Sequence, residues 1–93
     1  MDPMPRFEVG DTKEFTAGYS SAPSAPSLAI FTGSGNGTLV DSGTMASSSS
    51  IAFYRFFTVP NTPNAIYGWE IVGSFTNGPV VQRGTFLAVK TTA

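Results

Sequence analysis

Glycine, proline, serine and threonine recur every few residues along this chain and leave little room for a helix. The 93 residues include 10 Gly and 7 Pro. No window of about eleven residues shows the apolar period of 3.6 that a surface helix requires, whereas several short segments alternate apolar and polar residues. The sequence therefore predicts an all-β fold.

Segments with a period of two, bounded by turn residues, mark the strands. The clearest is 51–59, IAFYRFFTV, which Pro60 ends. The other expected strands cover residues 7–9, 14–19, 28–32, 39–40, 65–75 and 80–89. Gly84 is expected to form a bulge, and residues 20–26 and 43–50 are expected to be loops or irregular edges. This spacing predicts an immunoglobulin-like β-sandwich of about seven antiparallel strands.

One core is expected, because a chain of this length buries only about 60–65% of its unfolded surface. We therefore predict a single immunoglobulin-like domain over residues 1–93, with residues 1–5 as a flexible or partner-ordered arm. Trp69 is the residue most expected in the core. The inward-facing side chains are predicted to be Phe15, Tyr19, Leu28, Ile30, Phe53, Phe57, Tyr67, Trp69, Ile71 and Phe86.

The charge content excludes some classes of partner. Charged residues make up 12% of the chain, about half of the roughly 25% that is typical, while aromatic residues make up 13%. The formal net charge is -1, so the protein has no long-range electrostatic field that would attract nucleic acid or an anionic membrane. We expect neither as a partner. The N-terminus lacks the basic and apolar stretches of a secretion signal.

The residues for catalysis and metal binding are scarce. The chain has no His and no Cys, and its six carboxylates never form a spaced cluster. General acid-base, nucleophilic and metal-assisted mechanisms all need such groups close together. We predict no enzyme activity, no catalytic residues, no metal and no cofactor.

Two local features each allow two interpretations. Glu70, inside an apolar strand, is either a functional buried acid or one half of a solvated cross-strand pair with Arg55 or Arg83, and the pair is favoured. The segment 33–37, GSGNG, superficially resembles a phosphate-binding loop, but no helix follows it, so a hairpin turn is favoured.

The segment 51–59 carries more aromatic side chains than one core normally uses. Phe53 and Phe57 fall on one face, and Tyr54 and Phe56 on the other. A second aromatic face fits either a protein interface or the stacking of a sugar, and we favour the interface. The candidate interface residues are Tyr54, Phe56, Arg55 and Arg83.

Several short sequence words carry a resemblance to a known group of proteins. They are FEVGDTKEFTAGY near the start, YRFFTVP in the middle, then IYGWEIVGS and RGTFLAV. The chain resembles small immunoglobulin-like proteins encoded among phage and prophage structural genes. The SSAPSAPS and TMASSSS segments depart from that scheme, so contacts made by loops are not carried over.

The resemblance implies a virion component that is made in the cytoplasm of the bacterial host. The expected role is a capsid decoration or cement protein, or a neck or tail accessory protein, in symmetric contact with other virion proteins. Surface covered by neighbours also explains the low charge and the many aromatic residues. The alternative is a carbohydrate- or cell-surface-binding module. An enzyme or an enzyme inhibitor is a third hypothesis, and no residue set supports it.

Overall fold

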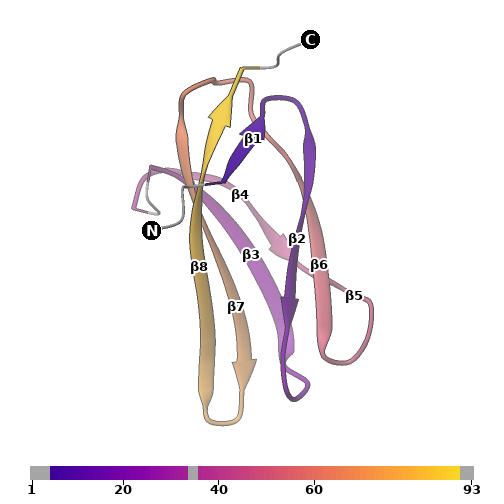
Figure 1. Cartoon of the computed structure of the whole chain (residues 1–93). Helices are drawn as coiled ribbons and strands as arrows, with labels where there is room; N and C mark the ends of the chain where they lie inside the picture. The colour runs from indigo at the N-terminus through magenta and orange to yellow at the C-terminus, as the bar shows by residue number, and fades with distance from the viewer. Residues whose placement is uncertain (1–4, 34–35, 91–93) are drawn as a thin grey trace.

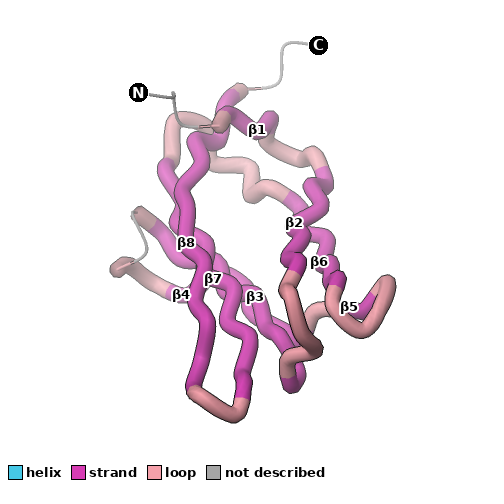
Figure 2. Tube along the Cα trace, turned by 60° about the horizontal axis from the view of Figure 1, so that its bottom comes forward, coloured by secondary structure: helices cyan, strands magenta, loops and turns pink. Residues whose placement is uncertain are grey.

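Two β-sheets make up the protein. The computed structural model describes residues 5–33 and 36–90, and these form eight strands and no helix. The strands are β1 (Arg6–Glu8), β2 (Thr12–Gly18), β3 (Ser24–Thr32), β4 (Leu39–Thr44), β5 (Ala46–Ser47), β6 (Ala52–Thr58), β7 (Ile66–Phe75) and β8 (Gly78–Val89). One sheet has the order β1-β8-β7-β3-β4 and the other the order β2-β6-β5 (Figures 1 and 2). The all-β prediction is confirmed.

The first strand corrects the expected all-antiparallel pairing. β1 pairs with β8 in parallel, with Arg6 opposite Leu87. The chain then leaves this sheet at Gly10, whose φ of 86° is in the region that favours glycine. Gly10 N donates a hydrogen bond to Val59 O at 2.9 Å, beside the start of β2 in the other sheet. β1 and β2 therefore belong to different sheets although only three residues separate them.

The strand count and the bulge at Gly84 were also wrong, whereas the two segments expected as loops or edges hold the edge strand β5 and the irregular start of β3. The described residues contain an eighth strand, β5, within the segment expected as loop or edge, and Met45 beside it is buried. β3 begins at Ser24, inside the other expected loop, with an irregular register up to Ser27. Gly84 forms no bulge, because β7 and β8 pair without a register shift. A Cβ there would lie 2.5 Å from the Trp69 ring, so the glycine makes room for the indole.

The predicted arm and turn lie partly outside the described residues. Residues 1–4 of the arm are outside, while the carbonyl of Pro5 accepts a hydrogen bond from Leu87 N at 2.9 Å. Residues 34 and 35 of the turn are outside as well. β3 and β4 on either side of them pair antiparallel, as a hairpin requires.

Phe86 lies at the centre of the core between the two sheets. It is fully buried on β8, and its ring stacks on Phe7 at 4.7 Å and on Tyr67 at 5.3 Å between centroids. Phe15 and Phe57 contact the same ring from the three-stranded sheet at 6.2 and 6.3 Å. Aromatic pairs at these distances are stabilising beyond the area that they bury. This cluster connects the two sheets, because its rings come from β1, β7 and β8 of one sheet and from β2 and β6 of the other.

The structure places eight of the ten predicted core residues in the interior. The two others, Tyr19 and Trp69, are half-buried and pack against the core. Trp69 was expected at the centre, but its indole lies over Gly84 and meets Phe15 edge to face at 5.9 Å. The centre is occupied by Phe86 instead. The eight buried residues are Phe15, Leu28, Ile30, Phe53, Phe57, Tyr67, Ile71 and Phe86.

Replacing the central ring should destabilise the fold strongly. We expect Phe86→Ala to lower the free energy of unfolding by about 3–5 kcal/mol, because it removes a fully buried ring and leaves a cavity. Phe56→Ala is the matched control, since Phe56 is 57% exposed and its loss should cost less than about 1 kcal/mol. Urea denaturation of both variants measures the difference. Equal destabilisation would contradict this assignment of the core.

Candidate contact surfaces

The four predicted interface residues lie in three different places. Tyr54 and Phe56 are on the outer face of the three-stranded sheet, where they lie opposite Thr16 and Glu14 of β2. Their rings meet edge to face at 5.8 Å. Phe56 is exposed and Tyr54 is half-buried. These two residues form a small aromatic surface, as the alternation of the segment predicted.

Arg55 is not on an outer face. It alternates with Phe53 and Phe57, so its side chain enters the space between the sheets and reaches β4. There its Nη2 lies 3.4 Å from Asp41 Oδ2, and the guanidinium packs over Gly43, where a Cβ would lie 2.5 Å from Arg55 Cζ. Arg55 therefore bridges the two sheets. Its role as an interface residue stays a prediction, with 28% of the side chain exposed.

Arg83 lies on the outer face of the five-stranded sheet, on the side of the molecule opposite to Tyr54 and Phe56. Its Nε donates a hydrogen bond to Glu70 Oε2 at 2.8 Å, across the β7–β8 pair. The Arg83 side chain is 72% exposed and that of Glu70 is 31% exposed. The solvated pair expected for Glu70 is confirmed with Arg83, and Arg55 pairs with Asp41 instead.

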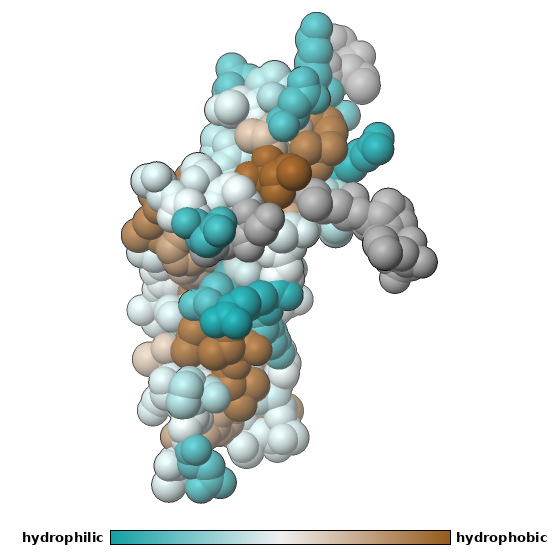
Figure 3. All heavy atoms as spheres, turned by 90° about the vertical axis from the view of Figure 1, so that its left-hand side faces the viewer, coloured by the Kyte–Doolittle hydropathy of each residue, from teal (hydrophilic) through white to brown (hydrophobic). Residues whose placement is uncertain are grey.

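Separate patches of exposed apolar side chains lie around Arg83, and the sequence reasoning missed them. Leu39 is 52% exposed, and Ile66 and Val81 are each 40% exposed. Figure 3 shows this side of the molecule. Both faces of segment 65–75 carry apolar residues, and this signal was overlooked because Glu70 made one face look polar. We call this surface the outer β7–β8 face. Its apolar residues are Phe31, Leu39, Ile66, Val72, Val81 and Leu87.

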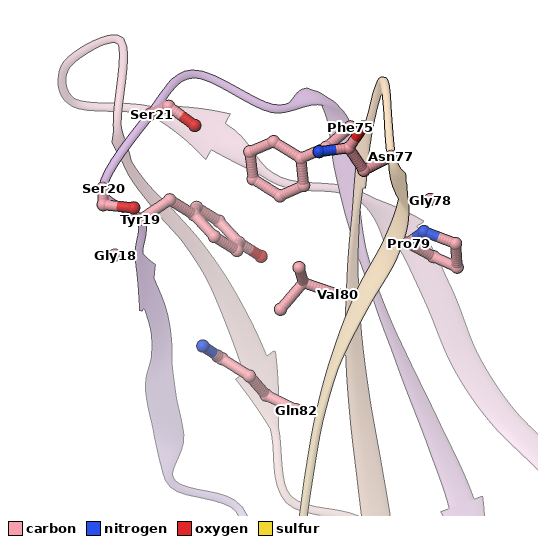
Figure 4. Close-up of a pocket in the computed structure, with 10 residues that line it drawn as sticks. All are labelled: Gly18, Tyr19, Ser20, Ser21, Phe75, Asn77, Gly78, Pro79, Val80 and Gln82. Carbon is pink, nitrogen blue, oxygen red and sulfur yellow. The ribbon is translucent and has the colours of Figure 1, made fainter.

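A pocket of about 490 Å³ opens at the end of the molecule where the β7–β8 hairpin lies. Figure 4 shows the side chains of Tyr19, Val80 and Gln82 pointing toward one another from the two sheets. Phe75 closes one wall and meets the Tyr19 ring at 5.5 Å. None of the ten lining residues is charged. They are Gly18, Tyr19, Ser20, Ser21, Phe75, Asn77, Gly78, Pro79, Val80 and Gln82.

Tyr19 is the titratable group of this pocket. Its Oη is buried and has no hydrogen-bond partner within the described part of the chain. Burial raises the pKa of the Tyr19 phenol above its ordinary value of 10.0, because the ionised form loses hydration. A Cβ on Gly73 would lie 2.9 Å from the Tyr19 ring, so this glycine lets the ring lie flat against β7. The pocket therefore favours a neutral phenol.

The raised pKa of Tyr19 predicts a loss of stability in alkali. Since the folded state holds the neutral phenol more strongly than the unfolded chain does, this contribution is complete below about pH 10. It is lost as the pH rises through the higher pKa of the folded state. We expect Tyr19→Phe to weaken the fall in unfolding free energy between about pH 9 and about pH 11, one pH unit either side of the ordinary pKa.

Denaturant titrations at a series of pH values measure this effect. Tyr54→Phe, which removes a phenol from the outer face of the three-stranded sheet, is the matched control for the substitution. An alkaline stability profile of Tyr19→Phe identical to that of the wild type would contradict the prediction.

Residues 5–33 and 36–90 contain no group of three or more acidic, His or Cys side chains placed to hold a metal ion. Within the same ranges, no helix is long and apolar enough to cross a membrane. Comparison of the chain with protein-family models, with curated proteins and with solved structures gives no match.

Proposed function

We propose that this chain is a non-catalytic structural protein of a phage virion and acts through protein-protein contacts. Its partners would be capsid, neck or tail subunits, as a decoration or cement protein or as a neck or tail accessory protein. The observation that carries the proposal is the outer β7–β8 face, where apolar side chains are exposed around a single ion pair. Exposed apolar patches with a polar component are typical of surfaces that another protein covers.

We also propose that the fold is immunoglobulin-like. If the strands are lettered in chain order from β2 as B, then β8-β7-β3 matches the G-F-C order and β2-β6-β5 the B-E-D order of immunoglobulin sheets. β4 takes the place of C′ beside C. The chain lacks the cysteine pair of antibody domains, and its tryptophan lies on β7 rather than on β3. Strand order, rather than these side chains, supports the proposal.

The virion role predicts that the protein is present in purified phage particles. We expect mass spectrometry of particles from the strain that carries the gene to detect it at a constant ratio to the major capsid or tail subunit. A constant ratio follows from symmetric placement in an assembly. Absence from particles, although the protein is present in the lysate, would contradict the role.

The pocket favours a second candidate function, a carbohydrate-binding module. Its aromatic rings, two side-chain amides and serine hydroxyls, with no charged group, match a neutral sugar, which has an apolar face and many hydroxyls. The pocket volume is within the range of about 300–1,000 Å³ that small ligands use. On this reading the site is the pocket, and not the Tyr54 and Phe56 face.

An NMR titration with neutral mono- and disaccharides tests this second function. We expect saturable shifts at the backbone amides of Tyr19 and Gln82 if the pocket binds sugars. Gln82→Ala should weaken binding by about tenfold, because it removes a side-chain amide and its hydrogen bonds. Flat titrations with glucose, galactose, mannose and N-acetylglucosamine, and with their disaccharides, would exclude the sugar reading.

A further inference from the structure

The outer β7–β8 face is arranged in rows, each formed by one residue of β7 and its register partner on β8. Ile66 lies opposite Leu87, and Val72 lies opposite Val81. Between these two apolar rows lie the uncharged row of Gly68 and Thr85 and the charged row of Glu70 and Arg83, which we call the central row. Each of the two apolar rows has two apolar members, and the central row carries one charge of each sign.

This row pattern is complementary to itself. Consider a two-fold axis that runs parallel to the strands, midway between β7 and β8, with two copies packed face to face. The axis exchanges β7 and β8 but keeps every row at its own height. Each apolar row then meets an apolar row, and Glu70 of each copy meets Arg83 of the other. An axis perpendicular to the strands would instead place like charges opposite each other.

The ion pair is suited to such a contact. Arg83 bonds Glu70 through Nε alone among its nitrogens, and a guanidinium has further N–H donors on both Nη groups. With 72% of the side chain exposed, these donors can reach a carboxylate of a second copy without breaking the bond within the chain. Four charges of alternating sign would then lie together, which offsets part of their desolvation.

The area of the outer β7–β8 face determines how strongly two copies are expected to associate. The five strands have 3, 9, 6, 10 and 12 residues, at about 3.3 Å per residue and about 4.8 Å between strands. The whole face is therefore on the order of 600 Å², somewhat below the roughly 800 Å² that each partner buries in a standard interface. An axis between β7 and β8 leaves β4 outside the overlap. A dimer at the weak end of specific interfaces is expected.

We propose that two copies of this chain associate through the outer β7–β8 face about this two-fold axis, with Glu70 of each copy paired to Arg83 of the other. The inference rests on the proposed function, since it names a partner for the same surface. It identifies a second copy of the chain as the protein that covers the exposed side chains of Ile66 and Val81.

Charge-swap variants, studied by sedimentation equilibrium, test the proposal. We expect the wild type to dimerise reversibly at concentrations from about 10 μM to 1 mM, the range of weak association. Glu70→Arg makes the central row all positive, and Arg83→Glu makes it all negative. Each variant alone should dimerise at least about tenfold more weakly than the wild type, because like charges meet across the axis.

The decisive sample is an equimolar mixture of these two variants. In each variant the pair within the chain is repulsive, so only contacts between chains can become attractive on mixing. We expect the mixture to form heterodimers at least as strongly as the wild type forms dimers. Glu14→Arg, on the outer face of the three-stranded sheet, is the matched control and should dimerise like the wild type.

Three results would overturn the proposal: a wild type that stays monomeric at 1 mM, single variants that dimerise like the wild type, or a mixture that stays monomeric. Failure of this inference is distinguishable from failure of the proposed function. A monomer found in phage particles would remove the dimer but keep the virion role. A dimer absent from particles would do the reverse.

Discussion

The packing of Phe86 against rings from both sheets is the contact on which the rest of the structure depends. Phe7 and Tyr67 stack on its two sides within the five-stranded sheet, while Phe15 and Phe57 reach it from the three-stranded sheet. With no disulfide and no buried charged or polar residue among the described residues, apolar contact is the main force between the layers. The Arg55–Asp41 pair adds a polar bridge near β4.

This core determines what the outer faces present. Alternation along β7 and β8 sends Tyr67, Ile71 and Phe86 inward, so Ile66 and Val81 must point outward. On the outward parity the Ile66–Leu87 and Val72–Val81 rows are apolar, and the Glu70–Arg83 row lies between them. Covering the apolar side chains of such a surface with another protein is favourable in free energy, because it removes apolar area from water. The proposed contact function therefore follows from the same alternation that builds the core.

Alternation within a strand made much of the fold predictable. The interior positions of Phe15, Phe53 and Phe57 followed from the period of two, and the Glu70–Arg83 pair followed from the expected neighbouring strands. What alternation cannot give is pairing between segments far apart in the sequence. The parallel pairing of β1 with β8 depends on the turn at Gly10, where the chain passes from one sheet to the other. The sequence indicates a turn there, but it does not specify which distant strand β1 pairs with.

The candidate sites were less predictable for the same reason. Alternation along the strand placed Arg55 on the same face as Phe53 and Phe57, but its charge favoured a position in solvent. Its side chain fits between the sheets because Gly43 leaves space for the guanidinium and Asp41 pairs with it, both from β4. Trp69 was expected in the core because it lies on a central strand, yet it lies half-buried over Gly84 and packs against the core. The pocket is built from two segments far apart in the sequence, 18–21 and 75–82, so no local pattern predicted that Tyr19 and Gln82 are neighbours. The phage setting stays a prediction.

Hydroxyl-radical footprinting, which measures how reactive each side chain is toward radicals in solution, tests most directly whether the outer β7–β8 face is the contact surface. The isolated, dilute protein would be compared with its assembled form, whether in particles or as a concentrated oligomer. The account predicts that Ile66, Val81 and Leu87 lose reactivity on assembly while Phe56, exposed on the opposite sheet, keeps it. Protection of Phe56 and Tyr54 with the outer β7–β8 face unchanged would contradict it.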